Sequence, residues 1–334
     1  VVSPDYAEAT KFADLWLNPK QGTDAALALA MGHVILREFH LDRQAEYFED
    51  YCRKYTDMPM LVRLVEKDGH YVPDRLVRAS EFKDALGEKS HPDWKTVAID
   101  ETSGKTVVPN GAIGHRWSGD SKWNLEQKDG KGKDVKLKMS LILDEDHDTV
   151  AETAFPYFGN REHDHFEGTD HQSVLMRSVP AKKVKLAEGE ALVATVFDLF
   201  VANYGLDRGL GGQNVAKTFD EDEPYTPAWA EKITGVPADH IITVAREFAA
   251  NAEKTNGRSY QAPLPRRSRR QPAAAAGAAA GLSYRCRTNP GHGPHGTGRR
   301  DRPAVDLPRL GLSRQGCRSS SRNRGRLKRH RLGS

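Results

Sequence analysis

The chain has 334 residues, which is enough for two domains with buried cores. Hydrophobic residues make up 38% of it and the net charge is +4, and no segment has the ~18 consecutive apolar residues of a membrane helix or the layout of a signal peptide. The three cysteines, Cys52, Cys286 and Cys317, are too dispersed to build a disulfide framework, an iron–sulfur site or a zinc ribbon.

The first forty residues have an α/β pattern. VVSPDY (1–6) predicts the end of a buried strand and then a turn at Asp5, and AEATKFADLWL (7–17) predicts a short helix with one apolar face. NPKQGTD (18–24) is typical of a loop. The wide apolar stripe of DAALALAMGHVILREFH (24–40) predicts a buried helix.

The next segment alternates between helix and hairpin signals. AEYFEDYCRKYT (45–56) predicts an amphipathic helix that buries Cys52 as an apolar residue. The dipeptide at 68–69, Asp-Gly between two extended runs, predicts a β-hairpin, and 95–109 predicts a second one. Ser80 is a candidate N-cap for a short helix.

The secondary-structure signal is weak in the middle of the chain and becomes clear again at residue 191. Residues 115–180 predict an irregular, loop-rich insertion with one strand, VKLKMSLIL (135–143). ALVATVFDLFVANYGL (191–206) predicts a strand that runs into a helix. Two more helices are predicted over 226–235 and 237–254.

The composition changes sharply after residue 260. The last 74 residues contain 18 basic and two acidic residues, with no Ile, Phe, Trp, Met or Glu, so this Arg-rich tail predicts disorder. The first 260 residues contain 32 basic and 44 acidic residues, a net charge of −12. We expect an α/β segment over 1–57, a β-hairpin and loop-rich insertion over 58–190, an α/β segment with terminal helices over 191–260, and the tail over 261–334.

The loop over 18–24 is the main candidate site. A helix N-terminus that follows Gly22 presents backbone N–H groups to a phosphate or a polar ring. The carboxylate of Asp24 is able to accept hydrogen bonds from the ring N–H and the amino group of guanine. The alternative is that Thr23 and Asp24 only cap the helix.

Three other features are weaker candidates. His163 and His165, with carboxylates nearby, have the residue types of a divalent-metal site, although a solvated surface loop accounts for them better. The Gly-rich segment 205–213 lacks the spacing of a phosphate-binding loop and predicts a turn. The Arg-rich tail suits contacts to nucleic-acid phosphates, but it lacks the interleaved aromatic residues of specific recognition.

Residues 1–260 also carry a resemblance to a known family. DLWLNPKQGTD (14–24), NLEQ (124–127) and ANYGL (202–206) are similar to the catalytic alpha subunit of respiratory membrane-bound nitrate reductase. That subunit belongs to the molybdopterin oxidoreductases, across which the PxxGTDxAL core and the TPAWAEKITGV segment recur.

The resemblance implies a fold and a cofactor. The fold is an α/β fragment of a molybdopterin oxidoreductase, with Rossmann-like strand–helix units and a loop-rich β insertion. The cofactor is molybdenum bis-molybdopterin guanine dinucleotide, and Asp24 is expected to pair with guanine. By motif match, the residues implied to line the site are Pro4, Asp5, Pro19, Lys20, Gly22, Thr23 and Asp24.

The resemblance further implies a partial catalytic subunit that reduces nitrate to nitrite in the intact enzyme. Its implied partners are an iron–sulfur beta subunit and a membrane cytochrome b gamma subunit, and its implied location is peripheral, on the cytoplasmic side of the cell membrane. The iron–sulfur cluster of the intact subunit is not ligated by this chain, and the family's aspartate ligand to molybdenum lies upstream of Val1. We therefore expect this chain to be inactive alone.

Alternatives remain open for the tail and for the function. Residues beyond Ser259 match nothing in the family, and their composition is that of GC-rich coding DNA read out of frame, with a genuine basic tail as the alternative. A selenate or chlorate reductase, or a non-catalytic nucleic-acid-binding protein led by its tail, are the alternative functions. Residues 1–260 are acidic and the excess of basic residues lies in the tail, which fits the reductase better than a nucleic-acid-binding protein.

Overall fold

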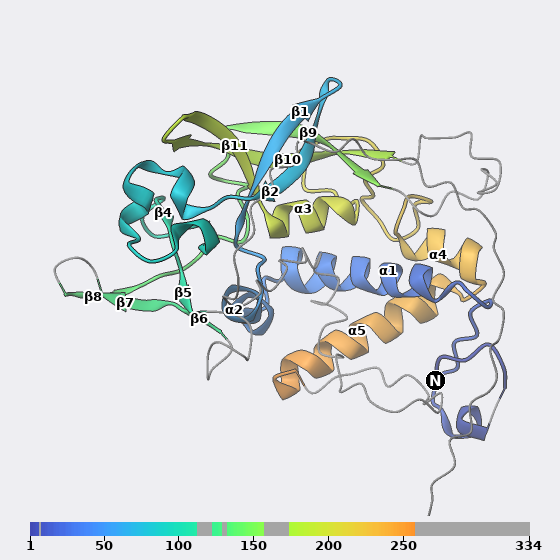
Figure 1. Cartoon of the computed structure of the whole chain (residues 1–334). Helices are drawn as coiled ribbons and strands as arrows, with labels where there is room; N and C mark the ends of the chain where they lie inside the picture. Colours follow the sequence, from blue (N-terminus) through green and yellow to red (C-terminus); the bar gives the residue numbers. More distant parts are fainter. Residues whose placement is uncertain (7, 112–121, 129–131, 157–173, 258–334) are drawn as a thin grey trace, which may run out of the picture. The chain divides into compact units, whose positions relative to one another are not determined.

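The computed structural model describes residues 1–6, 8–111, 122–128, 132–156 and 174–257 (Figure 1). The chain divides into two units, Val1–Arg285 and Cys286–Ser334, and every described residue belongs to the first. The predicted disorder of the Arg-rich tail falls outside the described residues. Within the described ranges, no helix has both the length and the apolarity to cross a membrane.

Five strands form a closed, mostly antiparallel barrel (Figure 1). In the order around the barrel the strands are β1 (Leu61–Lys67), β11 (Gly189–Thr195), β10 (Val174–Leu186), β9 (Thr149–Pro156) and β2 (His70–Leu76). Neighbouring strands pair in antiparallel fashion, except for β2 and β9, which pair in parallel at Tyr71 and Thr153.

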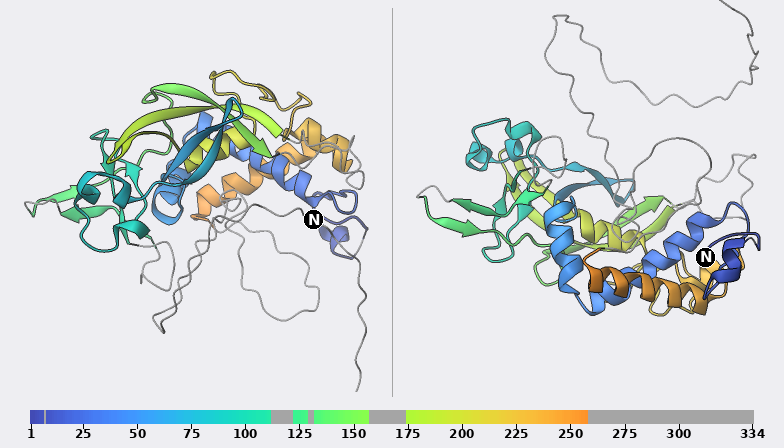
Figure 2. Two further views of the ribbon diagram at one scale, coloured as in Figure 1. Left: turned by 45° about the horizontal axis from the view of Figure 1, so that its top comes forward. Right: turned by 90° about the horizontal axis from the view of Figure 1, so that it is seen from below.

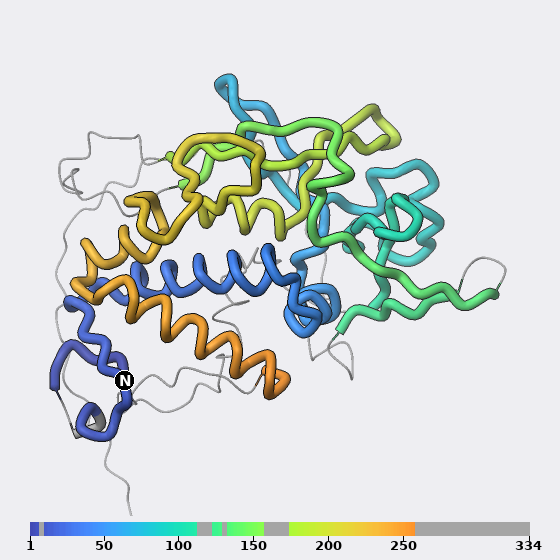
Figure 3. The backbone as a smooth tube through the Cα atoms, turned by 180° about the vertical axis from the view of Figure 1, so that it is seen from behind, coloured from blue at the N-terminus to red at the C-terminus, as the bar shows by residue number. Residues whose placement is uncertain are grey.

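A helical layer packs beside the barrel. Figure 2 shows α3 against the strands, with α1 and α5 on the other side of it. In Figure 3, α5 crosses α1, and α4 lies at the N-terminal end of α1. One core cluster joins apolar residues of α1, α4 and α5 to residues of the barrel. The helices are α1 (Asp24–Ile35), α2 (Glu46–Tyr55), α3 (Val196–Asn203), α4 (Pro227–Thr234) and α5 (Ala238–Thr255).

The predicted helices are largely confirmed. The apolar stripe of α1 is buried, and the helix continues as a π-helix, η2 (Leu36–Asp42). Cys52 is buried on α2, and burial raises the pKa of its thiol to about 12. The hydroxyls of Thr195 and Thr226 cap α3 and α4 by accepting backbone N–H bonds from the first turns.

Both predicted hairpins are confirmed. Asp68 and Gly69 have φ of 53° and 82°, the left-handed conformations that a two-residue hairpin turn requires, and they join β1 to β2. The second hairpin pairs β3 (Ala98–Ile99) with β4 (Thr106–Val107). Two further short hairpins follow, in which β5 (Asn110–Gly111) pairs with β6 (Trp123–Asn124) and β7 (Glu126–Lys128) with β8 (Asp134–Lys136).

The prediction of an irregular insertion over 115–180 is wrong in part. It contains β9 and the first half of β10, two strands of the barrel that pair over eight residues. The predicted strand over 135–143 is reduced to the short β8. The rest of that segment is irregular but places the side chains of Met139, Leu141 and Leu143 in the core, because apolar side chains can be buried without a regular backbone.

Three predictions also need correction, two near the N-terminus and one at Ser80. Val1 and Val2 are exposed rather than buried, because among the described residues only one bridge, Val2 to Leu17, pairs this segment. The predicted helix over 7–17 is a single 3-10 turn, η1 (Glu8–Phe12). Ser80 does not begin an α-helix: the segment forms three short 3-10 turns, η3 (Ala79–Glu81), η4 (Lys83–Gly87) and η5 (Pro92–Trp94).

Candidate functional site

Two extended segments run in parallel and end at the same edge. Val2 bridges Leu17 in parallel, with Ser3 N–H donating to Leu17 O at 3.0 Å and Leu17 N–H donating to Val1 O at 2.9 Å. Because parallel segments have their carboxyl ends on one side, the chain leaves both segments in the same direction. The loop at Pro4 therefore begins next to the loop that starts at 18, which is the arrangement in which α/β proteins bind ligands.

A short polar network fixes the first of these loops. Asp5 N–H donates to Ser3 Oγ at 3.3 Å, and the same hydroxyl donates to Asp5 O at 2.9 Å. Trp16 Nε1–H donates to Ser3 O at 2.9 Å and so ties the loop to the second segment. Pro4 and Asp5 remain exposed at its tip.

The second loop is a closed turn. Lys20 O accepts two hydrogen bonds from Thr23, one from its N–H at 3.1 Å and one from its hydroxyl at 2.6 Å. Gly22 has a φ of +81°, which favours glycine, and a Cβ there would have no heavy atom within 4 Å. Pro19 is buried beneath the turn, whereas Lys20 and Gly22 are exposed.

Asp24 is the first residue of α1 and is exposed. Within the described part of the chain, its carboxylate has no hydrogen bond or ion pair. The Thr23 hydroxyl bonds to Lys20 O and does not cap α1, so the first turn of the helix has no side-chain cap. The arrangement presents a carboxylate with two free acceptor oxygens, and the ammonium of Lys20 lies on the same loop.

These groups suit a guanine nucleotide. A carboxylate accepts two parallel N–H bonds, the pattern on one edge of guanine, and a helix N-terminus with a nearby lysine favours phosphate. The structure places Pro4 and Asp5 where the chain leaves the first segment, and Pro19, Lys20, Gly22, Thr23 and Asp24 where it leaves the second.

The structure gives no support for a site at the other candidates that it describes. The His163–His165 cluster lies outside the described residues. Elsewhere in the described ranges, no three His, Cys, Asp or Glu residues gather as a metal site would require. The Gly-rich segment 205–213 is irregular, as predicted, and follows α3.

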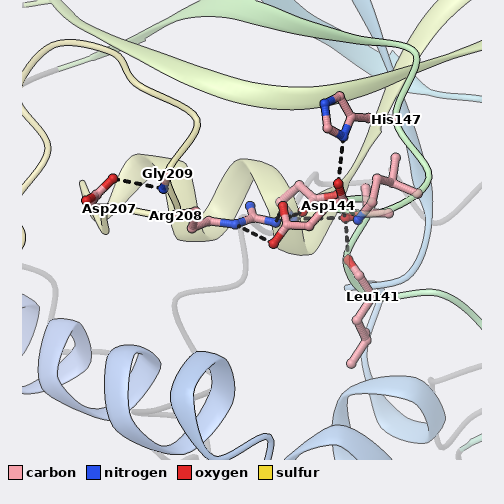
Figure 4. A network of polar contacts seen from close by, with 9 residues as sticks. Leu141, Asp144, His147, Asp207, Arg208 and Gly209 are labelled. Carbon is pink, nitrogen blue, oxygen red and sulfur yellow. Dashed lines mark hydrogen bonds and ion pairs between the residues drawn. The ribbon is translucent and has the colours of Figure 1, made fainter.

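Sequence reasoning missed a buried ion-pair network on that Gly-rich segment (Figure 4). Arg208 Nη2 lies 2.7 Å from the fully buried Asp198, and its Nε donates to Asp144 at 3.2 Å. Thr195 Oγ1 and Leu143 N–H donate to Asp198 Oδ2 at 2.8 and 3.2 Å. Burial raises the pKa of Asp198 to about 6, against the lowering effect of Arg208. The network is a structural clamp between α3 and two loops.

Two buried histidines are also polar groups that the sequence did not reveal. His33 Nδ1 lies 2.9 Å from Tyr204 O, and burial lowers the pKa of His33 to about 4. His40 packs between Phe48 and Phe197, and burial lowers its pKa to about 4 as well. Its Nε2 has no partner among the described residues. Both imidazoles are therefore neutral at pH 7.

Comparison with known proteins gives a consistent result. No family model matches the chain. The respiratory nitrate reductase 1 alpha chain of Escherichia coli (strain K12) is 56% identical over 260 residues, which is 77% of this chain and 21% of the relative. The nitrate reductase alpha chain of Bacillus subtilis (strain 168) is 42% identical over 260 residues, 77% of this chain and 20% of the relative. Perchlorate reductase subunit alpha of Dechloromonas aromatica (strain RCB) is only 26% identical over 250 residues, 74% of this chain and 20% of the relative.

These matches cover most of this chain but only a small part of each relative. The chain spans about a fifth of the length of the curated relatives it matches. Within this chain, the match extends over 260 residues, 77% of its length. Over about three quarters of its length, this chain therefore resembles a segment of the nitrate reductase alpha chain.

Proposed function

We propose that this chain is part of the catalytic alpha subunit of a respiratory nitrate reductase, which reduces nitrate to nitrite in the intact enzyme. The observation that carries the proposal is the 56% identity to a respiratory nitrate reductase alpha chain over 260 residues. Identity at this level over so long a segment is more specific than any single motif in it. The proposal keeps the division of the chain that the sequence predicts, into segments at 1–57, 58–190, 191–260 and 261–334.

We further propose that the two loops bind the guanosine end of a molybdopterin guanine dinucleotide. The support is the geometry at the end of the parallel segments, where the exposed Asp24 carboxylate and the Lys20 ammonium lie on one loop and Asp5 on the neighbouring one. The parallel segments and the helix that follows them are the part of the fold that fits a Rossmann-like unit.

The role of these residues is to bind and orient. Asp24 accepts the two N–H groups of guanine, Lys20 neutralises phosphate charge, and the positive φ of Gly22 lets the backbone turn close to the ligand. The chemistry supplied by the bound molybdenum cofactor is two-electron oxygen-atom transfer from nitrate. Electrons would arrive through the iron–sulfur cluster of the intact subunit, which the described residues do not ligate.

The remaining parts of the proposal concern the complex. An iron–sulfur beta subunit and a membrane cytochrome b gamma subunit are the proposed partners, and the proposed place is the cytoplasmic side of the membrane, as a peripheral subunit. The support is the name of the matched relatives, respiratory nitrate reductase alpha chains.

The alternative functions are less well supported. The comparisons do not favour a reductase for another oxyanion, such as selenate or chlorate, because the perchlorate reductase match is 26% identical against 56% for nitrate reductase. The nucleic-acid alternative depends on the tail, and the matched relatives are reductase subunits.

The guanine role of Asp24 has a direct test. In a full-length nitrate reductase alpha chain, the equivalent of Asp24→Asn places an amide donor opposite a guanine donor and removes a charge-assisted hydrogen bond, which costs about 1.5–3 kcal/mol of binding free energy. We expect the guanine nucleotide retained per subunit, measured after acid release, to fall.

The matched control is Asp239→Asn, because Asp239 is also an exposed acid in the first turn of a helix, α5, outside the loops. It should retain the wild-type nucleotide content. Equal content in the Asp24 variant and the wild type would rule out the guanine role.

A further inference from the structure

The end of α4 lies directly against the candidate loop. The Thr234 hydroxyl, fully buried, donates to Ala230 O at 2.7 Å and accepts from Val236 N–H at 3.0 Å. The next residue, Gly235, has φ 76° and ψ 5°, and its N–H donates to Glu231 O at 2.7 Å. Helix α4 therefore ends in a rigid turn that depends on a left-handed residue.

This turn contacts the loop through a backbone hydrogen bond. Lys20 N–H donates at 2.9 Å to Thr234 O, one of the carbonyls that the end of a helix leaves without a partner in the helix. A Cβ on Gly235 would lie 3.4 Å from Lys20 Cε, so the stem of the lysine runs along the turn. Lys20 O in turn accepts both hydrogen bonds from Thr23. A continuous series of bonds thus joins α4 to the start of α1.

We infer that the Thr234–Gly235 turn is a positioning element, which sets the backbone of the loop over 20–24 for binding the guanine dinucleotide. This inference rests on the proposed function of that loop. A loop held in one conformation before binding loses less conformational entropy when the ligand arrives. Helix α1 also packs on α4, so the bond from Lys20 adds a fixed point at the first residue of the loop to the packing that holds its far end.

Two substitutions at one position separate this role from a general loss of structure. Gly235→Val places a β-branched residue where φ is positive, which disfavours the turn. Gly235→Asn is the conservative variant, because asparagine tolerates the left-handed region. Gly69→Val is the control: Gly69 has a φ of +82° and open space around it, but it lies in the β1–β2 hairpin.

The first measurement is hydrogen exchange of the Lys20 amide in the chain of 334 residues. We expect Gly235→Val to speed that exchange by about 5- to 30-fold, the range that straining one left-handed residue produces. Gly235→Asn and Gly69→Val should leave it within about twofold of wild type. An unchanged Lys20 amide in the Gly235→Val variant would overturn the inference.

The second measurement is guanine nucleotide content in a full-length nitrate reductase alpha chain with the equivalent substitutions. Gly235→Val should lower it, Gly235→Asn should restore it, and Gly69→Val should not change it. If Asp24→Asn lowers the content and Gly235→Val does not, the positioning role is wrong while the proposed function stands. If Asp24→Asn has no effect and the Lys20 amide still responds to Gly235→Val, the proposed function fails and the contact is structural only.

Discussion

At the scale of single residues, the buried polar groups are what the sequence predicts least. Asp198 pairs with Arg208, ten positions away, and Arg208 with Asp144, 64 positions away. No local pattern marks such partners, because the fold and not the spacing brings them together. Asp24 is a candidate from sequence alone because its signal is local: a loop, a glycine and the start of an apolar helix.

The buried histidines predict how stability depends on pH. His33 and His40 have folded-state pKa values of about 4 against 6.5 when exposed, so the unfolded chain binds their protons first as pH falls. The contribution of the two histidines to the free energy of unfolding is therefore complete above pH 6.5 and declines from there to pH 4. The raised pKa of Asp198 acts in the opposite direction below pH 6, because the folded state then binds that proton first, so it makes the net slope smaller there.

Urea unfolding of the chain between pH 7 and pH 4 measures this slope. The groups that face His33 are Arg37 and Arg177, which lower its pKa further, whereas burial alone acts on His40. His40→Leu removes a buried ring nitrogen without a described partner, so it should reduce the slope at little cost at pH 7. A His40→Leu variant with an unchanged acid slope would contradict this account.

At the scale of elements, the sequence predicts those that depend on local signals, but not the strands that depend on long-range pairing. The β1–β2 hairpin follows from two turn residues between two runs. Strand β9 does alternate, with Ala151, Thr153 and Phe155 buried, but a threonine among them weakens the apolar signal. Strand β10 buries Arg177 and contains Pro180, both of which argue against a strand in sequence. Its pairing with β9 overrides these local preferences.

The start of α4 offers a test at this scale. The Thr226 hydroxyl accepts from Trp229 N–H at 3.1 Å, and α4 packs on α1 and α5. Thr226→Ala should lower the free energy of unfolding by about 0.5–2 kcal/mol, whereas Thr226→Ser keeps the acceptor and should lose less. Urea unfolding of the two variants decides this, and equal losses would show that the methyl group rather than the cap matters.

At the scale of the whole molecule, the tail remains a prediction from composition. Residues 261–334 have 18 basic and two acidic residues and too few apolar side chains to offset about 1–2 kcal/mol of backbone entropy per residue. We expect their amides to exchange with solvent without protection. Protected amides in this range, measured by hydrogen exchange, would show that the tail folds.

The central claim, that the matched segment is a working part of a nitrate reductase alpha subunit, is tested most directly by a chimera. The 260-residue segment of this chain would replace its counterpart in the Escherichia coli respiratory nitrate reductase 1 alpha chain, with which it is 56% identical. Bound molybdenum and nitrate reduction with reduced viologen would then be measured, beside the same chimera carrying Asp24→Asn. The account predicts bound molybdenum and nitrite formation in the first chimera and less of both in the second. A folded first chimera that binds no molybdenum and forms no nitrite would contradict it.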